Sequence, residues 1–374
     1  MGRRLDLYIL SQFLLPFISA TGIVTGVWLG IDRFKVIAKI MSSGKVEWFI
    51  GPYIMLLDIP KIILNTLPIC VLLACFLAFQ KLSSQAEFIA MRAAGASLLR
   101  ILKPVGIFGL IGLFTCFIVS EFIYPVSEPL SIKLFNKARS KSEKEIKSFT
   151  YIKRNEQGDT ERILYVKTAQ PNQNNYEDLI MVDFDDKKNS SGLEIYSADS
   201  ASFNQSEKEW NMNMVSYSSM IKKENQDLQH KIANPDSMKI ESRINPQKLL
   251  ASYRDANLLN FMKLFKLIKY HEKENLETSS LNSLKSNFHK RFSYPFTCTI
   301  LAIIGALLGL SPKRRAINWD YIVLGLIVFM FFMTQAISNS FGDSGRVLAW
   351  FSMWLPNIFL ILLAFGIYRY KLES

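Results

Sequence analysis

Three groups of charged side chains in this sequence are placed where they could do chemistry. The first is the cluster of Arg33, Lys35 and Lys39, which directly follows an apolar stretch. Lys35 and Lys39 are four residues apart and would share one face of a helix. Arg binds phosphate through a planar fork and Lys binds it as a point charge. The cluster indicates either a site for lipid phosphates or ordinary snorkelling of basic side chains to anionic headgroups.

The second group lies in the segment from 84 to 95, which predicts a short amphipathic helix. Ser84 is a suitable N-cap, and Gly95 stands where a C′ glycine ends a helix. Glu87 is in the first turn, where the helix dipole favours a carboxylate. Between two membrane helices, such a helix either docks a partner protein or lies on the lipid surface. Phe88 and Met91 lie on one side of this helix, and in the lipid interpretation Arg92 only follows the positive-inside pattern.

The third group is Asp58 and Lys61, one helical turn apart within a long apolar stretch. Charges inside a membrane helix are costly and are commonly paired or functional. They predict either a local ion pair near the outer face or a contact to substrate. Glu121 is a similar isolated charge in the next apolar stretch, and Pro125 is expected to mark the exit of the chain from the membrane.

The sequence lacks the motifs of the common catalytic sites. It contains no G-x-x-x-x-G-K-[ST] loop, no G-x-S-x-G elbow and no H-E-x-x-H pair. The 3 histidines have no cysteine partners at metal-ligand spacing, and the 4 cysteines all fall in apolar stretches. We therefore expect no catalytic residues, no metal site and no cofactor in this chain. Energy for mechanical work would come from a partner or an ion gradient.

Six apolar stretches must position these groups. A membrane helix needs about 20 apolar residues to cross the bilayer. The first stretch is too long for a signal h-region and has no small-residue cleavage site, so we interpret it as a retained helix. The stretches are approximately Ile9–Ile31, Tyr53–Phe79, Ile101–Tyr124, Tyr294–Leu310, Tyr321–Ile337 and Val347–Tyr368.

A polar insert of residues 125–292 separates the third stretch from the fourth. Short runs of alternating apolar and polar residues, separated by turn-rich pieces, predict strands with a core at about 148–235. The predicted fold is a polytopic α-helical membrane protein with six transmembrane helices, three on each side of an inserted all-β domain of the sandwich or β-jelly-roll type. The predicted divisions are 1–124, 125–292 with helical connectors, and 293–374.

The distribution of Lys and Arg predicts the orientation, because short cytoplasmic loops are enriched in both. With the N-terminus inside, the inner segments carry eleven: Arg3, Arg4, Lys81, Arg92, Arg100, Lys103, Lys313, Arg314, Arg315, Arg369 and Lys371. The outer loops carry five: Arg33, Lys35, Lys39, Lys45 and Arg346. We expect both termini in the cytoplasm and the insert in the periplasm of a bacterial inner membrane. Topology thus explains much of the net charge of +12 without nucleic acid as a partner.

Several motifs in the two membrane halves resemble the LptF/LptG lipopolysaccharide export permeases. They are Leu67-Pro68 through Lys81-Leu82, Glu87, Met91-Arg92-Ala93-Ala94-Gly95, Tyr294-Pro295, Pro312-Lys313-Arg314-Arg315 and Trp354-Leu355-Pro356-Asn357. The insert agrees mainly in its position and strand pattern.

The resemblance implies a permease subunit without its own ATPase site. In the family, two permease chains sit on a dimer of an LptB-like ATPase, and lipopolysaccharide taken from the inner membrane passes along periplasmic jelly-roll proteins, LptC-like and LptA-like. By position, Glu87 would be the carboxylate that meets the ATPase, with Phe88, Met91 and Arg92 beside it. Arg33, followed by Lys35 and Lys39, would contact the lipid phosphates.

Two other classes of protein are alternatives. An ion-coupled secondary transporter favours inverted repeats and polar groups on broken midplane helices, whereas the charges here cluster near helix ends. A receptor that senses periplasmic ligands would need no docking helix for an ATPase. Lipid-dependent ATPase activity on addition of an ATPase subunit separates this receptor from the permease.

Overall fold

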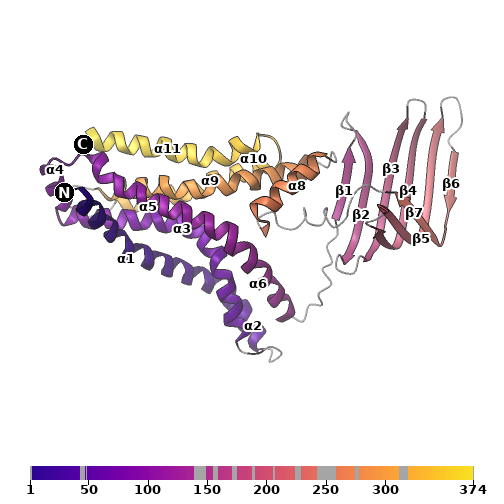
Figure 1. The fold of residues 1–374 in the computed structure, drawn as a ribbon, viewed down its shortest axis with the longest axis horizontal. Coiled ribbons are helices and arrows are strands. Elements are labelled where there is room, and N and C mark those ends of the chain that lie inside the picture. The colour runs from indigo at the N-terminus through magenta and orange to yellow at the C-terminus, as the bar shows by residue number, and fades with distance from the viewer. Residues whose placement is uncertain are drawn as a thin grey trace. The chain divides into compact units, whose positions relative to one another are not determined.

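The computed structural model of the chain describes residues 2–42, 47, 49–138, 149–154, 159–170, 175–187, 190–204, 207–223, 229–241, 258–273, 278–310 and 319–373. The chain divides into two compact units. The helical unit comprises Met1–Arg139 and Lys285–Ser374, and the sheet unit comprises Ser140–Leu284. Figure 1 shows the helices and strands of both.

The helical unit contains six described helical spans that are long and apolar enough to cross a membrane: Arg4–Leu29, Ile50–Ser84, Leu98–Phe135, Leu281–Gly309, Trp319–Asp343 and Ala349–Lys371. This confirms the six predicted spans and their arrangement as three before the insert and three after it. The elements are α1 (Gly2–Leu29), the π-helical turn η1 (Gly30–Phe34), α2 (Lys35–Ser42), α3 (Ile50–Ser84), α4 (Glu87–Ala93), α5 (Leu98–Ile118), the π-helical turn η2 (Val119–Ile123), α6 (Tyr124–Ala138), α9 (Thr278–Gly309), α10 (Trp319–Asp343) and α11 (Ala349–Glu373).

Helices α3 and α9 form the centre of the helical unit. In the apolar stretch of each, 67% of the residues are buried, against 17% in α1 and 22% in α10. Gly305 and Gly309, one turn apart on α9, allow this packing. A Cβ at Gly305 would lie 2.3 Å from the carbonyl oxygen of Leu72, and one at Gly309 would lie 2.5 Å from that of Phe76. Small residues spaced by four are a common way for membrane helices to approach closely.

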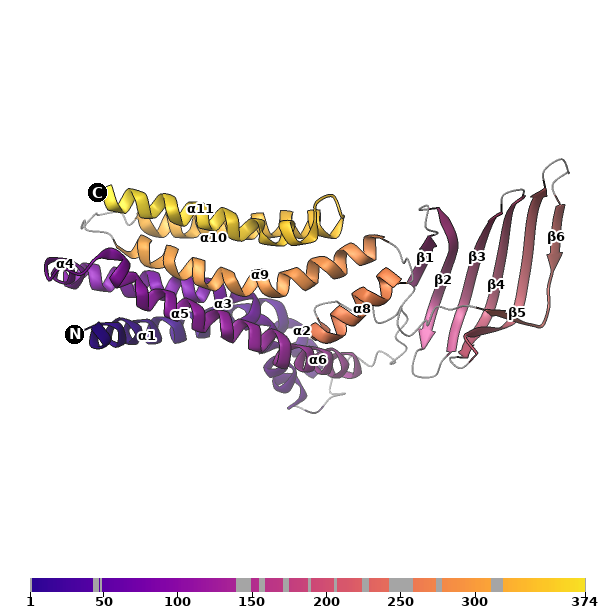
Figure 2. The same cartoon turned by 45° about the horizontal axis from the view of Figure 1, so that its top comes forward.

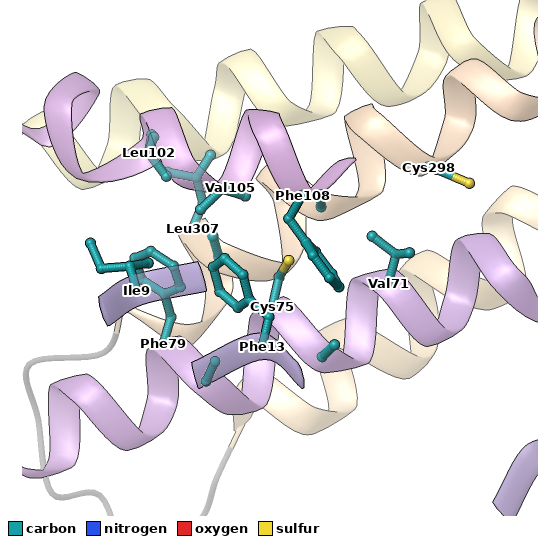
Figure 3. Packing of buried hydrophobic residues seen from close by; sticks show 14 of the residues in the cluster. Ile9, Phe13, Val71, Cys75, Phe79, Leu102, Val105, Phe108, Cys298 and Leu307 are labelled. Carbon is teal, nitrogen blue, oxygen red and sulfur yellow. The ribbon is translucent and has the colours of Figure 1, made fainter. Parts of the chain in front are cut away.

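The N-terminal turns of α1 are anchored to this centre by apolar side chains. Ile9 and Phe13 are fully buried, and Figure 3 shows them against Phe79 of α3 and near Phe108 of α5. The Phe13 ring lies 5.0 Å from that of Phe108 and 6.0 Å from that of Phe79, measured between centroids. Most of the remaining surface of α1 is exposed and apolar, as expected for a helix that faces lipid.

The third span continues beyond the predicted boundary at residue 124. Helix α5 passes through η2 into α6, which ends at Ala138. Pro125 therefore lies inside a continuous helical segment and not at its end. Proline lacks the N–H that would bond to the carbonyl four residues earlier, here Glu121. The π-helical turn, with its longer hydrogen-bond period, spans that carbonyl and allows the helix to continue.

The sheet unit is an antiparallel sheet in which consecutive strands are neighbours, in the order β1-β2-β3-β4-β5-β6, with β7 also paired to β5. An all-β insert between the third and fourth spans is confirmed. The strands are β1 (Phe149–Arg154), β2 (Thr160–Gln170), β3 (Asn175–Lys187), β4 (Ser190–Asn204), β5 (Glu209–Lys223), β6 (Gln229–Ala233) and β7 (Ser237–Glu241). Helix α8 (Phe261–Lys273) belongs to the same unit.

The alternation of buried and exposed residues is interrupted once within the central strands. On one side of the interruption the even-numbered residues are buried, and on the other side the odd-numbered ones are. In β3, Tyr176 and Leu179 both lie in the core, and in β5 so do Met212 and Val215. A regular strand would send such residues to opposite faces. Asp178 has φ 52° and Met214 also has φ 52°. These left-handed residues reverse the alternation, so both halves of the strands face a single core.

Candidate functional site

Helix α4 lies between α3 and α5, at the end of the helical unit where both chain termini are found (Figures 1 and 2). We call this end the terminal end, and the end with α2 and α6 the far end. Helix α3 runs to Ser84, whose hydroxyl donates to the carbonyl of Lys81 at 2.8 Å. The predicted N-cap at Ser84 is therefore wrong: Ala86, with φ 59°, precedes the first residue of α4, Glu87.

The C-terminal end of α4 follows the prediction for Gly95. This glycine has φ +86°. Its N–H donates to the carbonyl of Arg92 at 3.0 Å, and the N–H of Ala96 donates to that of Met91 at 3.1 Å. These two bonds make a Schellman motif, which satisfies carbonyls at the helix end. Only glycine adopts this backbone conformation at little cost, so Gly95 fixes where α4 stops and α5 begins.

The four predicted contact residues of α4 face two directions. Phe88 and Met91 are partly buried and pack against the core cluster of α1, α3, α5 and α9. Arg92 is exposed, and Glu87 is half-buried. Ile89, which sequence reasoning did not select, is 56% exposed. Phe88 and Met91 therefore hold α4 on the bundle, while Glu87, Ile89 and Arg92 are open to a partner.

Three side-chain contacts connect α1 to α4 and to the two helices on either side of it, and we call them the terminal clasp. Tyr8 donates its hydroxyl hydrogen to Oε2 of Glu87 at 2.6 Å. Lys81 donates to Oε1 of Gln12 at 3.0 Å. Arg100 forms an ion pair with Asp6 at 3.0 Å. Sequence reasoning missed all three because each pair is separated by at least 69 residues.

At the far end, Asp58 and Lys61 each bind a residue of α6. Ser131 donates to Oδ1 of Asp58 at 2.6 Å, and Lys61 donates to Oε1 of Glu128 at 2.6 Å. The predicted ion pair between Asp58 and Lys61, both of which the structure describes, is therefore absent. Helix α6 runs along this part of α3 and supplies a nearer carboxylate and hydroxyl, so the two charges are satisfied between helices.

A second ion pair at the far end connects the two halves of the helical unit. Arg291 of α9 donates to Glu121 of η2, and both side chains are only 8% exposed. The prediction that placed Arg291 in the insert assigned it to the wrong unit, because α9 begins before the apolar stretch. The sequence does show that Glu121 and Arg291 are charges that need a partner. It does not show that the helices which carry them are neighbours.

The basic cluster lies on the backbone that follows α1. Arg33 is in η1, and Lys35 and Lys39 are in α2. Their side chains lie outside the described part of the structure. Among the described residues, no group of three or more His, Cys, Asp or Glu side chains is placed to hold a metal ion.

The model of the lipopolysaccharide export system permease family LptF/LptG matches residues 7–371 of this chain. The chain belongs to the LptF/LptG family. It is also 24% identical over 367 residues to the lipopolysaccharide export system permease protein LptG of Haemophilus influenzae, and the alignment covers 97% of each chain. The predicted resemblance is thereby confirmed. The family and the six apolar helices identify a multi-pass lipopolysaccharide export permease of the inner membrane.

Two motifs of the LptF/LptG resemblance meet within the helical unit. Asn357 of α11 donates to the carbonyl of Ser293 at 2.6 Å and accepts from the hydroxyl of Thr297 at 2.9 Å. Tyr294 donates to the carbonyl of Asn65 in α3 at 2.9 Å. Hydrogen bonds of this kind join neighbouring helices within a bilayer. These motif residues of the LptF/LptG chain therefore fix how α3, α9 and α11 pack.

Proposed function

We propose that this LptF/LptG chain is the membrane-spanning permease subunit of an ABC transporter. It takes lipopolysaccharide from the inner membrane and passes it to a periplasmic bridge of LptC-like and LptA-like proteins. The family match over residues 7–371 supports the substrate. The chain has no nucleotide-binding motif, so an LptB-like ATPase dimer supplies the energy, and this chain is neither an enzyme nor a cofactor protein.

One observation carries the coupling to that ATPase, namely α4 at the terminal end. Its apolar side is held by the bundle through Phe88 and Met91, and its other side presents Glu87, Ile89 and Arg92. A carboxylate, an apolar side chain and a guanidinium on one short helix match a protein partner better than lipid. A helix that lay on lipid would turn its apolar side outward. The terminal end is therefore the cytoplasmic side, as the eleven basic residues of the inner segments favour.

The far end is then the periplasmic side, where the substrate contacts lie. Arg33, Lys35 and Lys39 stand on the backbone that emerges from α1. Their charge suits the phosphates of lipid A at the outer leaflet. A second permease chain, either a paralogue or a second copy, completes the membrane path, which membrane lipid surrounds. The sheet unit continues the path in the periplasm.

Charge reversal at Glu87 tests the docking of the ATPase. The tagged chain is co-expressed with the ATPase and the second permease chain, and the ATPase recovered by affinity purification is quantified. We expect Glu87→Lys to lower the recovered ATPase by about tenfold or more, because the substitution reverses the charge that α4 presents to the ATPase. Arg369→Glu, at the same end but on α11, is the matched control for a local charge change. Equal recovery from Glu87→Lys and wild type would contradict the proposal.

A further inference from the structure

The terminal clasp fastens α1 to the helix that would meet the ATPase. Ile9 and Phe13 point into the core of the bundle. At about 100° per residue, Asp6 lies on one flank of this buried stripe, and Tyr8 and Gln12 lie on the other. The first flank binds Arg100 at the start of α5, and the second binds Glu87 and Lys81 on either side of the turn between α3 and α4. Polar links thus hold α1 from both sides.

The side chain that binds Glu87 within this chain is a tyrosine and not a cation. Tyr8 is a neutral donor, so its hydrogen bond orients the carboxylate without cancelling the negative charge. Within the part of the chain that the structure describes, Oε2 is the carboxylate oxygen of Glu87 that is engaged. Among the described residues, no Lys or Arg forms an ion pair with Glu87. Hydrogen bonds to a carboxylate are stronger than those between neutral groups, so Tyr8 fixes one oxygen while the other stays available to a cation from outside.

The contact between Tyr8 and Glu87 joins α4 to one end of α1, which is a continuous helix. A helix of 28 residues is about 42 Å long at 1.5 Å per residue, which exceeds the thickness of the hydrocarbon core. Beyond its end follow η1 and α2, where Arg33, Lys35 and Lys39 are located. Most of the surface of α1 is exposed, and within the helical unit α1 packs chiefly along α3, the helix that precedes α4. A movement of α4 that is passed to Tyr8 is therefore carried toward the basic cluster.

We propose that Tyr8 is a positioning residue of the ATPase contact, and that the terminal clasp makes α1 the element that carries the movement of α4 across the membrane. This inference rests on the proposed function of α4. Tyr8 holds the Glu87 carboxylate toward the cation of the ATPase. Asp6–Arg100 and Gln12–Lys81 keep α1 aligned with α4 during each cycle of ATP hydrolysis.

The test is the ratio of lipopolysaccharide released to ATP hydrolysed by the complete complex in proteoliposomes. Tyr8→Phe keeps the ring and removes only the hydroxyl. We expect it to lower this ratio roughly threefold to tenfold, the scale of one lost hydrogen bond to a charged group in a partly exposed setting. Tyr370→Phe is the matched control, because Tyr370 is an exposed tyrosine in the last turn of α11. A ratio for Tyr8→Phe equal to that of Tyr370→Phe would overturn the inference.

Two further variants separate a positioning role from a loss of folding. Asp6→Arg and Arg100→Asp should each lower the ratio, and their combination should restore it, because the pair is then formed in reverse. In the Glu87→Gln background, Tyr8→Phe should have little added effect, since both changes act on one contact. Full additivity, or no rescue by the reversed pair, would refute the clasp. If Glu87→Lys leaves the recovery of the ATPase unchanged, both the docking proposal and this inference fail. If Glu87→Lys lowers the recovery as expected but Tyr8→Phe leaves the ratio unchanged, only this inference fails.

Discussion

Replacing Gly305 by alanine should separate the two central helices of the unit. The added Cβ would lie 2.3 Å from the carbonyl oxygen of Leu72 and 3.2 Å from the backbone nitrogen of Phe76. An ordinary contact needs at least 3.4 Å, so α9 must move away from α3 by about 1 Å. Backbone atoms cannot rotate aside as a side chain can. Overpacking of this kind costs about 1–3 kcal/mol.

The matched control is Gly325→Ala in α10, where the new Cβ would meet no atom within 4 Å. There the change removes only the helix-weakening effect of glycine and should be neutral or stabilising by up to about 1 kcal/mol. The assay is the midpoint of thermal denaturation in detergent micelles. We expect the two variants to differ on the order of 5–10 °C, with Gly305→Ala the lower. Equal midpoints would refute the close approach of α3 and α9.

Two other substitutions test the far end and the sheet unit. Glu121→Gln should destabilise the chain by about 3–5 kcal/mol, because it removes the negative charge from a buried ion pair with Arg291. The double change Glu121→Leu with Arg291→Leu should recover most of the loss. Thermal denaturation of both variants beside the wild type measures this, and equal stability of the single and double variants would contradict it. Burial lowers the pKa of His271 in α8, despite its hydrogen bond to the carbonyl of Leu267. In the unfolded chain this histidine has its ordinary pKa of 6.5 and takes up a proton at a higher pH than in the folded chain. The stability that neutral His271 contributes is therefore present above pH 6.5. It is lost as the pH falls from 6.5 through the lower pKa of the folded state. His271→Gln should weaken the acid dependence of α8 amide protection in hydrogen exchange, and an unchanged dependence would exclude His271 as its source.

The amino-acid sequence predicted the membrane helices better than the contacts between them. Apolar length is a local property, so the six spans could be located from their residues alone. The alternating runs of the insert likewise predicted strands, although the positive φ values at Asp178 and Met214, which reverse the alternation, have no such signal. Gly95 was predicted correctly because the end of a helix depends on its own few residues.

Partners across helices could not be predicted in the same way. Asp58 and Lys61 are neighbours on α3, but each one binds a residue of α6. Those contacts depend on how α6 packs against α3. Tyr8 was not selected as a functional residue because nothing near it in sequence points to Glu87. Charge and spacing identify the groups that need a partner. The fold decides which partner each one has.

The most direct test of the central claim is release of lipopolysaccharide from proteoliposomes that contain this chain, its ATPase and the second permease chain. We expect release to a soluble jelly-roll acceptor only when ATP and this chain are both present, and loss of release with Glu87→Lys. Release that proceeds without ATP, or that continues when this chain is omitted, would contradict a role for this chain as an ATP-driven permease subunit.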